Sequence, residues 1–111
     1  MSAAETKPRL QRIGRRTRVR PEAISAYRDW HKRIWAEIVE LTREAGIRNY
    51  TIYMDGPDLF SYFEVEDLTA AMAFLSRSDL SNRWQTLMAP LMDAPVAESP
   101  WQVLEEVLHL D

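Results

Sequence analysis

The stretch YRDWHKRIWAEIVELTREAGIRNYTIYMD, residues 27–55, decides the fold of this chain of 111 residues. Apolar residues in its first part recur with a period close to 3.6, which predicts an amphipathic helix that begins just after Pro21. Gly46 predicts the end of that helix after Ala45, because glycine readily adopts the left-handed conformation that helix ends often need. The β-branched and aromatic residues from 47 to 54 predict a strand directly after it.

The flanking sequence supplies three more strands and a second helical region. The predicted strands cover residues 9–20, 59–66 and 101–110. Asp67 is a typical N-cap for a helix over residues 68–77, and a second helical piece is expected from about 79 to 92, followed by a loop. The order β-α-β-β-α-β is the ferredoxin-like plan, an α+β fold in which both helical regions cover one face of an antiparallel sheet. The strands are too apolar to leave the other face in water, and a second subunit is the simplest cover.

Composition predicts one domain, since 46% of the residues are hydrophobic and 28% are charged. Residues 1–8 are small and polar and predict a disordered tail, which leaves a single domain over 9–111. The chain has no apolar run long enough to span a bilayer and no apolar signal-peptide core, so we expect a cytoplasmic protein without a membrane partner. Cysteine is absent, which excludes disulfides, thiolate nucleophiles and cysteine-based metal sites.

Basic residues are concentrated at the start of the chain. Seven of the 14 precede the first predicted helix: Lys7, Arg9, Arg12, Arg15, Arg16, Arg18 and Arg20. Such a segment can bind nucleic acid. The chain as a whole is acidic, with a pI near 5.4, and Glu64, Glu66, Glu105 and Glu106 lie on the later strands. Cross-strand ion pairs are therefore the favoured interpretation, and we expect no nucleic-acid partner.

His31 is the best candidate for acid–base chemistry, because an imidazole titrates near neutral pH. The competing interpretation is a hydrogen-bonded structural histidine at the helix edge. Tyr27 and Trp35 lie four residues to either side and would share its helix face. Tyr50 and Tyr53 are three apart on a strand and face opposite sides, so only one of them can join His31.

Metal and cofactor sites have no support in the sequence. No His-x-x-His, Glu-x-x-His or carboxylate cluster has ligand spacing, and the three glycines form no phosphate-binding loop. The second histidine, His109, alternates with leucines near the end of the chain and is expected to be exposed or at an interface. We therefore expect neither a metal nor a cofactor.

Three segments together resemble the L-rhamnose mutarotase family: the stretch quoted above, LFSYFEVED and SNRWQTLMAPLM. The resemblance extends over residues 12–111 and implies a dimeric ferredoxin-like α/β barrel. It also implies that α and β anomers of a free monosaccharide are interconverted without a cofactor. By position, it implies that His31 is the catalytic proton donor and that Tyr27 and Tyr50 contact the sugar. Trp84 matches the first tryptophan of the family's substrate-binding pair.

Two departures from the family pattern bear on the substrate. Gln85 replaces the second tryptophan of the pair, and an amide discriminates between hydroxyl epimers because the wrong epimer leaves it unpaired. L-fucose therefore competes with L-rhamnose as the expected 6-deoxy-hexose. Arg15, Arg16 and Arg18 occupy strand positions expected to be more apolar. An arginine that reached the pocket would favour an acidic sugar, but a surface position is the expectation.

Two other functions stay open from the residues alone. Some dimeric ferredoxin-like barrels are cofactor-free oxygenases, and others bind haem through a histidine, which His31 could supply. A non-catalytic ligand-binding or structural dimer is the third possibility. In all three cases a second copy of the chain is the expected protein partner.

Overall fold

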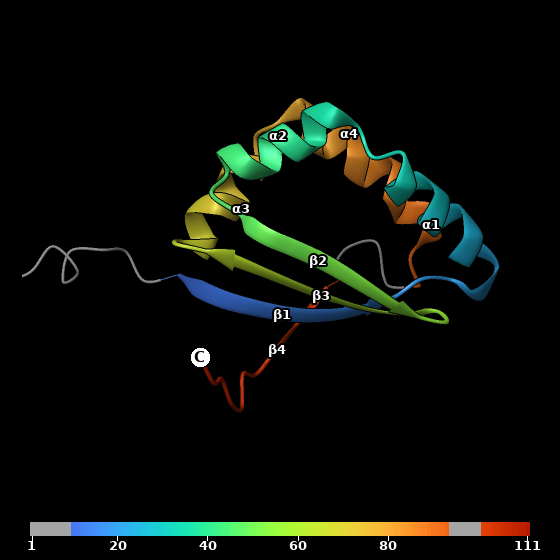
Figure 1. Cartoon of the computed structure of the whole chain (residues 1–111). Helices are drawn as coiled ribbons and strands as arrows, with labels where there is room; N and C mark the ends of the chain where they lie inside the picture. Colours follow the sequence, from blue (N-terminus) through green and yellow to red (C-terminus); the bar gives the residue numbers. More distant parts are fainter. Residues whose placement is uncertain (1–9, 94–100) are drawn as a thin grey trace, which may run out of the picture.

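The computed structural model describes residues 10–93 and 101–111. The four strands are β1 (Gln11–Arg18), β2 (Arg48–Asp55), β3 (Asp58–Val65) and β4 (Gln102–Leu104). They form one antiparallel sheet in the order β2-β3-β1-β4. The helices arch over one face of this sheet (Figure 1). The ferredoxin-like α+β prediction is confirmed, whereas the predicted tail, residues 1–8, lies outside the described residues and the domain limits stay a prediction.

The single helix predicted before Gly46 is wrong, because two helices occupy that stretch. These are α1 (Ile24–Lys32), preceded by the short 3-10 helix η2 (Pro21–Ala23), and α2 (Ala36–Glu44). Between them Trp35 is extended, with φ −62° and ψ 132°. The sequence contains no glycine or proline at the break. At the break the Trp35 ring packs against Trp84, with centroids 5.3 Å apart.

The other helix ends agree with their sequence signals. Gly46 has φ +89°, and the amides of Gly46 and Ile47 donate to the carbonyls of Arg43 and Thr42, which closes α2 in a Schellman motif. Asp67 caps α3 (Leu68–Ser76) by accepting from the Ala70 amide at 3.0 Å.

The second helical region ends near Met92 as predicted, but its α-helical part is shorter than predicted. α4 (Asp79–Met88) gives way to the 3-10 helix η3 (Ala89–Leu91) instead of continuing to Met92. Pro90 lies in η3 and has no amide hydrogen for a helical bond, so the α-helix ends just before it. The part of the predicted loop at residues 94–100 lies outside the described residues.

The fourth strand is also shorter than predicted, since β4 pairs with β1 only from Gly14 to Arg16. Beyond it the chain leaves the sheet and ends on the side away from the helices (Figure 1). Val107 in this segment is 88% exposed. His109 lies there too, and its Nε2 is 2.9 Å from Asp111 Oδ1.

The expected ion pairs of the basic segment form in part. Arg12 makes a two-pronged pair with Glu106, with N···O distances of 2.9 and 2.8 Å. Arg18 lies 3.5 Å from Asp58 on the adjacent strand. Lys7 and Arg9 lie outside the described residues.

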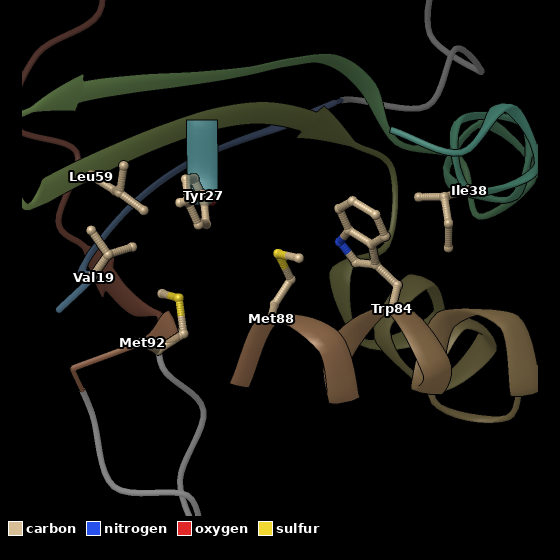
Figure 2. Close-up of a cluster of buried hydrophobic side chains, with 7 residues drawn as sticks. All are labelled: Val19, Tyr27, Ile38, Leu59, Trp84, Met88 and Met92. Atoms are coloured by element: carbon tan, nitrogen blue, oxygen red, sulfur yellow. The ribbon is translucent and has the colours of Figure 1, made fainter. Parts of the chain in front are cut away.

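The core between sheet and helices falls into two clusters. The larger contains Val19, Tyr27, Ile38, Leu59, Trp84, Met88 and Met92. Figure 2 shows these side chains converging from the sheet and the helix layer. The smaller contains Ile13, Ile47, Phe63, Val65 and Ala71. Regular alternation along β1 and β3 directs their buried side chains to the helix side.

Candidate active site

A cavity of about 700 Å³ opens between the sheet and the helices. Its wall includes Ile38 and Trp84 from the larger core cluster and Ile47 and Phe63 from the smaller one, so the cavity separates the two clusters. Four of the five predicted site residues line it: His31, Tyr50, Trp84 and Gln85. The fifth, Tyr27, is buried against His31 without lining the cavity.

His31 is held by its own helix. Its Nδ1 lies 2.9 Å from the backbone carbonyl of Tyr27, one turn earlier in α1. A carbonyl can only accept a hydrogen bond, so Nδ1 carries the proton and Nε2 of the neutral ring keeps its lone pair for a ligand. Burial lowers the pKa of His31 below its usual value, against a smaller opposing effect of this hydrogen bond. The imidazole is therefore neutral at neutral pH.

Tyr27 supports the imidazole ring. The two rings stack with centroids 4.1 Å apart and planes 28° apart. Burial raises the pKa of Tyr27 far above its usual value, and the nearby Tyr50 raises it further, while Arg15 lowers it. Tyr27 therefore stays a neutral phenol at neutral pH.

Trp84 is the centre of an aromatic group. It projects from α4, is 7% exposed, and meets His31 and Trp30 edge-on, with centroid distances of 5.6 and 6.1 Å. Trp35 also reaches it, from the break between α1 and α2 instead of from the helix face shared with His31. Next to Trp84, the exposed Gln85 turns toward the cavity from the same helix.

The sheet supplies Tyr50 and Arg15. Arg15 Nη2 donates to the Tyr50 hydroxyl at 2.7 Å, and Nε donates to Ser61 Oγ at 3.2 Å. Tyr50 also stacks on Phe63, with centroids 5.4 Å apart. Burial raises the pKa of Tyr50, and the charge of Arg15 opposes this. Tyr53 faces the opposite side and is 66% exposed, so Tyr50 is the tyrosine that joins His31.

The expectation of a surface position for Arg15 is wrong. It lies on the same side of β1 as the buried Ile13 and Thr17, whereas Arg16 points to the other side and is exposed. Strand alternation was the signal that could have found it, had Ile13 been taken as inward-facing. Trp101, which also lines the cavity, has no comparable signal because it stands alone before β4.

Across residues 10–93 and 101–111, no group of three or more potential ligand side chains is placed to hold a metal ion. Within the same part of the chain, none of the helices has the length and apolar character needed to cross a membrane.

Comparison with known proteins places this chain in a family. The family model for L-rhamnose mutarotase matches residues 12–110. An L-rhamnose mutarotase from Ligilactobacillus salivarius is 36% identical over 106 residues, which cover 90% of this chain and 97% of the relative. One from Burkholderia orbicola is 33% identical over 105 residues, covering 92% of this chain and all of the relative.

A solved structure agrees in fold. The crystal structure of an L-rhamnose mutarotase from Formosa agariphila superposes with a TM-score of 0.77 at 24% identity, covering 91% of this chain and 99% of that one. The match of the family model over nearly all of the chain, together with relatives at this level of identity, makes the chain a member of the L-rhamnose mutarotase family.

Proposed function

We propose that this protein interconverts the α and β anomers of a free aldopyranose by acid–base ring opening and closure in the cavity. L-rhamnose is the first substrate to test, because the relatives are named for it. L-fucose is the second, since Gln85 gives the cavity an amide to pair with sugar hydroxyls. The observation that carries the proposal is the state of His31, whose Nδ1 is occupied by a carbonyl while Nε2 stays available.

One imidazole can complete the proton transfer. The anomeric oxygen O1 and the ring oxygen O5 are both bonded to C1, so a single Nε2 can reach both. Neutral His31 takes the proton from O1 and delivers it to O5 as the C1–O5 bond breaks, which leaves an open-chain aldehyde. After the aldehyde turns, the same steps in reverse close the ring on its other face. Such proton transfer contributes roughly 10²–10⁴-fold to a rate.

The other site residues would hold the sugar. Tyr50 accepts a hydrogen bond from Arg15, so its own hydroxyl proton is free to point at a sugar oxygen. The Trp84 indole offers a flat apolar surface to the ring of the sugar, and Gln85 offers an amide to its hydroxyls. Tyr27 stacks on the imidazole and keeps it in place.

We also propose that the protein is a homodimer that uses the sheet face opposite the helices. Alternation directs Tyr53 and Phe60, which are cross-strand partners, to that face, and Leu104 lies there opposite Gly14. All three bear large exposed surfaces. An apolar sheet face of this kind is typical of a surface that another subunit covers.

The decisive experiment is exchange NMR on the anomeric protons of L-rhamnose and L-fucose, with wild type, His31→Asn and the matched control His109→Asn. We expect faster exchange with wild type and His109→Asn, and at least a 100-fold loss with His31→Asn. Full activity of folded His31→Asn would contradict the mechanism. If neither sugar exchanged faster with folded wild type, both proposed substrates would be wrong.

The same preparation tests the remaining functions. A Soret absorbance band in the purified protein, lost in His31→Asn, would indicate haem binding instead. Sugar binding without faster exchange would indicate a non-catalytic binding protein.

A further inference from the structure

Arg15 brings a permanent positive charge into the cavity wall. Within residues 10–93 and 101–111 no carboxylate lies within ion-pair distance of it, whereas Arg12 and Arg18 on the same strand both have acidic partners. Placing a part-buried cation at a ligand cavity without a counter-charge is unfavourable for folding alone. The arrangement is favourable once an anion enters the cavity.

The guanidinium is held in a fixed orientation. Its Nε and Nη2 donate to Ser61 and Tyr50. The Cζ atom also lies over the rings of Trp101 and Phe63, at 4.6 and 4.9 Å from their centroids. These contacts use two of the five N–H donors of an arginine. The other donors, on the Nη edge, suit the two oxygens of a carboxylate.

We propose that Arg15 binds a carboxylate on the sugar, so that the preferred substrate of this protein is a hexuronic acid with a free anomeric hydroxyl. This inference rests on the proposed mutarotase function and refines its substrate. In a pyranose, C6 is attached to C5, the ring atom next to O5. A carboxylate at C6 therefore sits on the neighbour of the oxygen that exchanges its proton with His31.

Two observations place Arg15 near that reacting end of the cavity. Arg15 itself lines the cavity that His31 lines. Tyr50, which Arg15 holds, lines the same cavity as His31. Gln85, in place of an aromatic wall, leaves the cavity with polar groups that match an acidic sugar better than the methyl group of a 6-deoxy sugar.

The test compares sugars that differ only at C6. Galacturonate and fucose form such a pair, and each is available in D and L forms. Exchange NMR measures the anomer interconversion of all four with wild type, Arg15→Met and Arg15→Lys. Arg16→Met, one residue along β1 on the opposite face, is the matched control, and sedimentation checks that each variant keeps the wild-type assembly state.

We expect wild type and Arg16→Met to favour one galacturonate over its fucose by roughly 10- to 100-fold in kcat/KM. Arg15→Met should lose that preference through the KM for the acid. Because Arg15 also holds the Tyr50 hydroxyl, the readout is the ratio of the two kcat/KM values and not the activity on fucose alone. Arg15→Lys, which keeps the charge without the fork of donors, should retain part of it. Equal or better activity on the neutral sugars, or an unchanged preference in Arg15→Met, would overturn the inference.

Binding separates this inference from the proposed reaction. The methyl glycosides of galacturonate and fucose have no free anomeric hydroxyl and cannot open, so calorimetry measures their binding alone. Arg15-dependent binding of the acidic glycoside, without exchange on any free sugar, would refute the mutarotase proposal and uphold anion recognition. Exchange on the neutral sugars alone, with no preferential binding of the acidic glycoside, would uphold the mutarotase proposal and refute anion recognition by Arg15.

Discussion

The protonation state of His31 follows from one hydrogen bond and from burial of the ring. The carbonyl of Tyr27 fixes the tautomer, and burial makes the charged ring less favourable. Both effects come from α1 and its packing, so the helix that carries the imidazole also determines its tautomer and the direction of its pKa shift. A histidine at this place is prepared to accept a proton first.

The activity should therefore fall on the acid side. Because the pKa of His31 is lowered from 6.5, kcat/KM should decrease on the acid side with a midpoint below pH 6.5, as the imidazole becomes charged. A pH–rate profile of the preferred sugar measures this. An acid limb centred well above pH 7 would contradict the assignment, as would an unchanged limb in the residual activity of His31→Asn.

The same shift affects stability with a defined sign. The folded state holds the His31 proton less tightly than the unfolded chain, so the unfolded state binds more protons as the pH falls. The contribution of His31 is complete above pH 6.5 and is lost as the pH falls through its folded pKa. Urea unfolding should show this loss in wild type and a smaller one in His31→Asn.

Thr17 offers a second residue-scale test. Its Oγ1 is buried on the helix side of β1 and has no hydrogen-bond partner among the described residues. Replacing the hydroxyl by a methyl group in Thr17→Val should raise the free energy of unfolding by about 1 kcal/mol. Thr17→Ser, which keeps the hydroxyl and removes the methyl group, is the control and should be destabilising. A lower stability for Thr17→Val in denaturant unfolding would show that the hydroxyl is satisfied in solution.

At the scale of elements, the sequence predicted correctly those helix ends that are set by residues close by in the chain. Gly46 ends α2 and Asp67 begins α3 because the backbone groups that they satisfy lie within a few residues. The break at Trp35 instead coincides with a long-range contact of its ring with Trp84, which lies far along the chain. No residue near the break carries that information, so the sequence predicts one helix where there are two.

The site was predictable to the same extent. Tyr27 and His31 lie one turn apart in α1, as predicted, because their spacing requires only a single helical turn. The inward direction of Arg15 depends on the phase of β1, which its run of arginines conceals. The place of Trp101 depends on the pairing of β4 with β1, which is a property of the whole sheet.

The start of β2, which lines the cavity, contains a bulge. The register with β3 shifts between Arg48 and Thr51, and Asn49 there has φ +54°. Asparagine tolerates this left-handed conformation and valine does not. Both Asn49→Gly and Asn49→Val lose the side-chain bond to Glu64. Asn49→Val should be less stable than Asn49→Gly by about 1 kcal/mol in thermal unfolding, and the opposite order would contradict the role of the bulge.

At the scale of the whole molecule, the sheet has one face under helices and one face that no helix of the described residues covers (Figure 1). If the homodimer forms there, Phe60→Lys should convert it to a monomer, because a charge would be buried without a partner. Light scattering after size exclusion measures the mass. Leu87→Lys places the same charge on an exposed leucine of α4 and should leave the mass unchanged. A monomeric wild type, or a dimer in Phe60→Lys, would reject the interface.

The cavity between the two core clusters has a consequence for heat resistance. A space of about 700 Å³ inside so small a domain forgoes apolar contacts that a closed core would make. A bound sugar would fill that space and supply the contacts that the protein's own side chains do not make there. Ligand at 100 times its dissociation constant adds roughly 2.7 kcal/mol to the folded state. The melting temperature should therefore increase with a sugar that binds in the cavity and stay unchanged with one that does not. Thermal unfolding can thus identify the ligand before any turnover is measured.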